Sequence, residues 1–218
     1  MGCFVARYSS DGTFLSVQQA SGGTQSEGSG VGLTRDADGN YALCGMFAPG
    51  ALFGTGLDTV PMVAIEMDAY LASFDSAGSL NWAAQITGLS MEAATRLGVH
   101  TDGSVAVTGA YASTAVFAPT LPAEVTHTAA GEFDIFVAKY DSGGALSWVR
   151  SVGGAGTDIG YGVAIAEDGC VIAVGQFANS VTFGQGVAGA ATLNSAGETD
   201  IYIVKYNPEG TLAPPASP

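Results

Sequence analysis

A segment of seven residues recurs along this chain at a fixed interval of 66 residues. Its copies begin at positions 2, 68, 134 and 200 and read GCFVARY, DAYLASF, DIFVAKY and DIYIVKY. Self-similarity at a fixed period of this size is typical of structural units that bury apolar surface against one another. The chain therefore holds three full copies, 2–67, 68–133 and 134–199, then the first strand of a fourth at 200–212 and a Pro-rich tail at 213–218.

Each copy predicts about four antiparallel β-strands. The recurring segment is followed by a turn and a second apolar run, and one glycine of that turn stays in register at Gly12, Gly78, Gly144 and Gly210. A third and a fourth apolar run flank an Asp-Gly dipeptide, as in 97–101 and 105–111, which is a hairpin signal. Length varies only in the connections 54–67, 118–133 and 184–199, where we expect surface loops on one side of the fold.

The recurring strand is apolar on both of its faces. In the third copy Phe136 alternates with Ile135 and Val137, and Lys139 is the one charged residue after Asp134. Burial on both faces is expected of a sheet that is stacked between neighbouring sheets. We therefore predict an all-β protein made of β-propeller-like blades, with one blade per copy. A β-sandwich and a β-solenoid with 66-residue turns are the alternatives.

The charge of the chain limits its partners. The chain has twenty acidic and six basic residues, which gives a formal net charge of −14. The basic residues are scattered singly, so the sequence offers no patch that could neutralise phosphates, and we expect no nucleic-acid partner and no attraction to an anionic membrane surface. No apolar run approaches the roughly 20 residues of a spanning helix, so we also expect no membrane insertion.

The repeat resembles that of a known family. The residues that carry the resemblance are Trp148, Asp168-Gly169, Gly175, Phe183-Gly184, 193–197 and 200–206. They are similar to the bacterial SBBP repeat, which is named for a seven-bladed β-propeller. The resemblance implies a secreted or cell-surface scaffold or binding module, with no family-wide catalytic residues. It is weakest in the first copy, where Ser16 replaces the tryptophan and Gly2 the aspartate.

Carboxylates give two candidate cation sites. Asp36, Asp38 and Asn40 partly match a calcium loop, but their spacing departs from that pattern and no bidentate glutamate follows. A second candidate is the set of aspartates that recur at one repeat position, Asp68, Asp134 and Asp200. We expect a plain hairpin at the first candidate, and at the second we expect turn residues that accept backbone N–H groups. We expect no cofactor, with calcium as the alternative.

Two tryptophans and two histidines remain as candidates. Trp82 and Trp148 hold the same repeat position, so we expect them to pack between blades; stacking on a glycan is the alternative if they face the loops. His100 and His127 are the only histidines and lie in different copies. Nothing in the sequence places either beside a nucleophile or an acidic pair, so we expect a protein that is not an enzyme.

We thus predict an extracellular or cell-surface propeller module for protein or glycan binding, or for surface assembly. A secreted hydrolase or lyase domain and a calcium-stabilised lectin-like domain are the alternatives. Because propellers close with about four to eight blades, three copies do not make a ring. We expect the chain to be part of a longer propeller, to self-associate, or to be capped by another protein.

Overall fold

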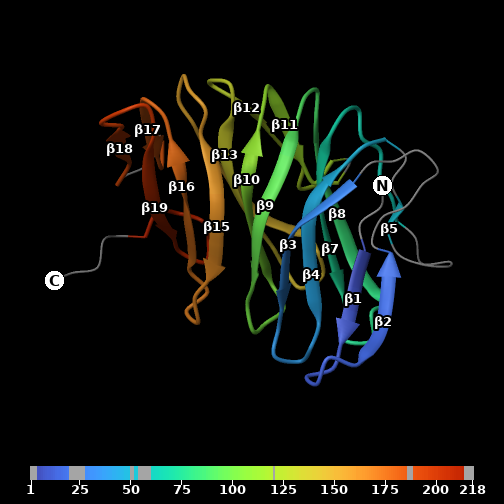
Figure 1. The fold of residues 1–218 in the computed structure, drawn as a ribbon. Helices are drawn as coiled ribbons and strands as arrows, with labels where there is room; N and C mark the ends of the chain where they lie inside the picture. The colour runs from blue at the N-terminus through green and yellow to red at the C-terminus, as the bar shows by residue number, and fades with distance from the viewer. Residues whose placement is uncertain are drawn as a thin grey trace.

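The computed structural model describes residues 4–19, 28–49, 52–53, 60–119, 121–185 and 189–213. Every regular element in these residues is a β-strand, so the prediction of an all-β fold is confirmed (Figure 1). No helix in the described part of the chain is long and apolar enough to cross a membrane.

The long strands form a series of antiparallel sheets. Sheet 1 has the order β3 (Gly28–Arg35), β4 (Tyr41–Phe47), β7 (Asp68–Phe74), β8 (Leu80–Gly88). Sheet 2 has the order β9 (Glu92–Val99), β10 (Val105–Tyr111), β13 (Asp134–Tyr140), β14 (Leu146–Val152). Sheet 3 contains β15 (Ile159–Ile165), β16 (Val171–Phe177) and β19 (Asp200–Tyr206). The N-terminal pair consists of β1 (Phe4–Tyr8) and β2 (Phe14–Gln19).

The sheets are offset from the sequence copies by two strands. β4 pairs with β7, β10 with β13 and β16 with β19, so each sheet joins the last two long strands of one copy to the first strands of the next. The boundaries at 68 and 134, which we used to assign one blade to each copy, therefore lie inside sheets 1 and 2. This offset ties neighbouring copies together by backbone hydrogen bonds.

Short hairpins occupy the connections that we expected to be loops. They are β5 (Leu52–Phe53) with β6 (Val60–Pro61), β11 (Thr114–Phe117) with β12 (Val125–Thr128), and β17 (Ser180–Phe183) with β18 (Ala191–Asn194). β11 also pairs with β8 and so extends sheet 1 at its outer edge. The second strand of each hairpin was not predicted, because it is only two to four residues long.

The sheets stack face to face in chain order, and Figure 1 shows them side by side from β1 to β19. β3, β9 and β15 each lie at one edge of their sheet, and β9 contacts both of the others. One apolar cluster fills the space between sheets 1 and 2, and a second fills the space between sheets 2 and 3. Every residue of β13 is buried, as two-sided packing requires. This radial stacking is that of consecutive propeller blades.

The tight turns gather at one end of the stack, which we call the turn face. Because successive strands are antiparallel, the β3–β4, β9–β10 and β15–β16 turns all lie at the lower edge of Figure 1. Gly39, Gly103 and Gly169 have φ values of +87°, +83° and +77° in these turns. A positive φ is the reason why the Asp-Gly signal of each copy needs its glycine.

Candidate functional site

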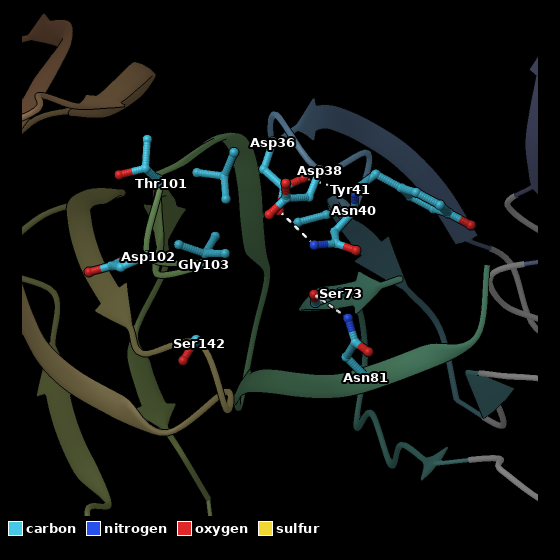
Figure 2. Close-up of a pocket in the computed structure, with 13 residues that line it drawn as sticks. Asp36, Asp38, Asn40, Tyr41, Ser73, Asn81, Thr101, Asp102, Gly103 and Ser142 are labelled. Carbon is cyan, nitrogen blue, oxygen red and sulfur yellow. Dashed lines mark hydrogen bonds between the residues drawn. The ribbon is translucent and has the colours of Figure 1, made fainter. Parts of the chain in front are cut away.

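A pocket opens on the turn face between sheets 1 and 2, with a volume of about 250 Å³ (Figure 2). We call it the turn-face pocket. Sheet 1 supplies its residues from the β3–β4 turn and from β4, β7 and β8. Sheet 2 supplies them from the ends of β9 and β10, from the turn between these strands and from Ser142. Its polar lining is Asp36, Asp38, Asn40, Tyr41, Ser73, Asn81, Thr101, Asp102 and Ser142.

The candidate calcium residues form one wall of this pocket. The carboxylate of Asp36 accepts the backbone N–H of Asn40 and its side-chain N–H, both at 2.8 Å. These bonds close the β3–β4 turn, and the segment forms the hairpin that we expected there. In the described part of the chain, no group of three or more histidine, cysteine or acidic side chains is placed to hold a metal ion.

The opposite wall carries Asp102. Its carboxylate accepts the backbone N–H of Ser104 at 2.8 Å and lies 3.1 Å from the Nδ1 of His100. Hydrogen bonds from Ser104, followed by the contact with His100, lower the pKa of Asp102 to about 2. Asp102 is therefore ionised at neutral pH, so the pocket is bounded by negative charge on both sides.

Ser73 lines the turn-face pocket, and the other copies carry a basic residue at the same repeat position. The residues there are Arg7, Lys139 and Lys205. The Nζ of Lys139 donates to the carbonyl oxygen of Gly169 at 3.4 Å. The Nζ of Lys205 lies 3.4 Å from the carboxylate of Asp168. In two other copies, an ammonium group thus reaches the turn residues of an Asp-Gly hairpin.

The turn-face pocket presents the same partners without the ammonium group. Gly103 is the repeat equivalent of Gly169, and both Asp38 and Asp102 are equivalents of Asp168. Ser73 is too short to reach them, and its hydroxyl instead accepts a hydrogen bond from Asn81 at 3.4 Å. The replacement of a basic residue by Ser73 is visible in the sequence, but the groups that a basic side chain would contact there depend on the sheet pairing.

The two tryptophans lie between sheets and not on the turn face. Trp82 stacks on Tyr140 with ring centroids 6.1 Å apart, and Trp148 lies 5.7 Å from Tyr206. Both indoles are buried. Their faces are covered by the next sheet, which is the packing position that we expected for them.

The recurring aspartates lie at the start of β7, β13 and β19, on the opposite edge from the turn face. Asp134 accepts the backbone N–H of Ala130 at 3.1 Å, and Asp200 accepts that of Ala196 at 2.6 Å. Asp68 instead accepts a hydrogen bond from the side chain of Gln85 at 2.9 Å. Two of the three thus take the turn role that we expected.

The sequence did not single out Glu92, which lies beside Asp68. Its side chain is buried, and burial together with the neighbouring charge of Asp68 raises the pKa of Glu92 to about 9. Burial also raises the pKa of Asp68. Glu92 is therefore protonated at neutral pH in the folded protein.

The two histidines lie at opposite ends of the stack. His100 is in the β9–β10 turn at the lower edge of Figure 1, and His127 is in β12 at the upper edge. His127 lines a groove with Arg150, and burial lowers its pKa. The structure does not bring the two imidazoles together.

A model of the β-propeller family described as a domain of unknown function, DUF5122, matches residues 187–212. No curated protein matches the chain. The short match falls on β18, β19 and the turn that follows, and it supports a β-propeller repeat for the stacked sheets described above.

Proposed function

We propose that this chain is a non-enzymatic β-propeller module that binds a protein partner by taking a lysine side chain of that partner into the turn-face pocket. The observation that carries the proposal is the ammonium group of Lys139, which donates to Gly169 in the equivalent groove. Where Ser73 replaces the basic residue, the pocket lined by Asp36, Asp38 and Asp102 is left without an ammonium group. A lysine side chain of the partner would place its ammonium group where Lys139 and Lys205 place theirs in the other copies.

The chemistry of the pocket suits an alkylammonium group. A carbonyl oxygen at Gly103 and the carboxylates of Asp38 and Asp102 are acceptors only, and ionised acceptors make the stronger hydrogen bonds with an ammonium donor. Asp36 contributes charge but has both oxygens engaged by Asn40. The volume of about 250 Å³ admits one extended side chain.

The resemblance to SBBP repeats supports placing this module at the bacterial cell surface or outside the cell. In that setting, lysine recognition would serve attachment to another surface protein. The net charge of −14 favours encounter with a basic partner at low ionic strength.

The test is a titration of the protein with Nα-acetyl-lysine amide. It is monitored through the NMR chemical shifts of residues in the β3–β4 and β9–β10 turns. We expect saturable shifts that disappear with the Nε-acetylated analogue, which lacks the charge. Ser73→Lys should weaken binding by at least about tenfold, because its own ammonium group fills the pocket. Ser73→Thr is the matched control and should retain binding, because it adds no charge. Equal binding by wild type and Ser73→Lys would rule out the pocket as the site.

A further inference from the structure

The outer face of sheet 3 exposes large apolar side chains. Ile201 and Ile203 in β19 are 80% and 73% exposed. Their repeat equivalents in β13, Ile135 and Val137, are each 1% exposed, because sheet 3 covers them. Val174 in the neighbouring strand β16 is also exposed. We call this surface of sheet 3 the C-face.

The free face of the N-terminal pair is apolar as well. Phe4 and Tyr8 in β1 are 68% and 59% exposed, whereas their equivalents in β13, Phe136 and Tyr140, are fully buried. Val17 in β2 is also exposed. We call this surface the N-face. It lies at the opposite end of the stack from the C-face in Figure 1.

The two faces are the two halves of one interface. Between sheets 2 and 3, Ile135 and Val137 belong to the same apolar cluster as Tyr202 and Tyr206. Ile201 and Ile203 repeat the first half of that contact on the C-face. On the N-face, Phe4 and Tyr8 stand at the repeat positions of Tyr202 and Tyr206, and so they repeat the second half.

We propose that the C-face of one copy of this chain packs on the N-face of a second copy, in the way that sheet 2 packs on sheet 3. This inference goes beyond the lysine site, which lies on the turn face. A second copy is the occupant that fits, because each face matches the other and the chain carries both. The contact is heterologous, so it propagates head to tail until the copies close into a ring.

Light scattering coupled to size exclusion, at two protein concentrations, tests the association. We expect the wild type to exceed the 21.8 kDa mass of one chain. The double variant Ile201→Asp/Ile203→Asp should be monomeric, since two buried charges weaken the contact by at least about a hundredfold. Leu89→Asp, an exposed leucine in the β8–β9 connection, is the matched control and should associate as the wild type does.

A mixing experiment tests the direction of the contact. Phe4→Asp blocks the N-face alone, and Ile201→Asp/Ile203→Asp blocks the C-face alone. Each variant should be monomeric, and their mixture should give a 1:1 dimer, because one free face of each kind remains. Circular dichroism melts should show that each variant is folded. If the double variant is not folded, the single variant Ile203→Thr takes its place in the mixing experiment.

Two outcomes would overturn the proposal. One is a wild-type chain that stays monomeric at both concentrations. The other is a mixture of the two variants that stays monomeric although the wild type associates. Binding of the lysine probe is independent of both results, because the turn-face pocket contains none of the substituted residues.

Discussion

The backbone of Gly144 lies against the indole of Trp82, so closely that a Cβ atom at position 144 would sit 2.7 Å from the ring. Gly210 and Trp148 repeat this relationship with a separation of 2.6 Å. The indole of Trp82 also donates a hydrogen bond to the carbonyl oxygen of Ser142 at 3.1 Å, in the same turn. The first hairpin turn of one copy therefore covers the tryptophan of the copy before it.

Replacing Gly144 with alanine should destabilise the fold through this contact. The residue has a φ of +84°, so alanine brings backbone strain of about 1 kcal/mol. The clash with Trp82 should add about 1–3 kcal/mol, as overpacking of a core does. Gly12→Ala is the matched control, since Gly12 has a φ of +83° and nothing within 4 Å of the added Cβ. If urea denaturation shows the same loss of unfolding free energy for Gly144→Ala and Gly12→Ala, backbone strain alone accounts for the destabilisation.

The proton that Glu92 keeps in the folded protein makes stability depend on pH. The pKa of Glu92 is raised from its usual 4.5 to about 9, so the folded state holds a proton that the unfolded state releases. This contribution to stability is fully present below about pH 4.5 and is lost as pH rises towards 9. We expect the Tm of the wild type to fall across this range.

Glu92→Gln tests the sign of that effect, because the amide cannot ionise. Its Tm should change less than that of the wild type between about pH 5 and pH 9. Glu167→Gln, at an exposed position, should leave the wild-type profile unchanged. A wild-type Tm that rises over this interval would contradict the retention of this proton by Glu92.

Much of the fold follows from the sequence, because the 66-residue period fixes where each strand recurs. The sequence also predicts the tryptophan packing and the Asp-Gly hairpins. It does not predict which strands share a sheet, since β4 pairs with β7 across a copy boundary and no local pattern records that choice.

The site was only partly predictable for the same reason. Asp36, Asp38 and Asn40 stand out as oxygen-bearing residues, and they do meet in one pocket. Ser73 and Asp102 complete it from the second copy, so their contribution depends on how the sheets stack. The buried pair of Asp68 and Glu92 is equally non-local, and no spacing in the sequence joins the two.

Cys44 should be unreactive in the folded protein. Its side chain is fully buried in the cluster between sheets 1 and 2, and burial raises the pKa of its thiol to about 12. The thiolate is the reactive form, so iodoacetamide at mildly alkaline pH should modify Cys44 far more slowly than in concentrated urea. Peptide mass spectrometry measures both rates. Similar rates in the two conditions would place Cys44 outside the core. Cys3 lies outside the described residues.

Removal of calcium should leave the melting temperature unchanged. Both carboxylate oxygens of Asp36 already accept hydrogen bonds from Asn40, so they would have to leave these donors in order to bind a metal ion. Calcium also needs six to eight oxygen ligands, whereas this hairpin offers only a few. We therefore expect equal Tm values in excess calcium and in chelator. Asp38→Asn provides the control, because it removes a free carboxylate and should not make the Tm respond to calcium either. A Tm that rises with calcium in the wild type but not in Asp38→Asn would establish a calcium site in the turn-face pocket.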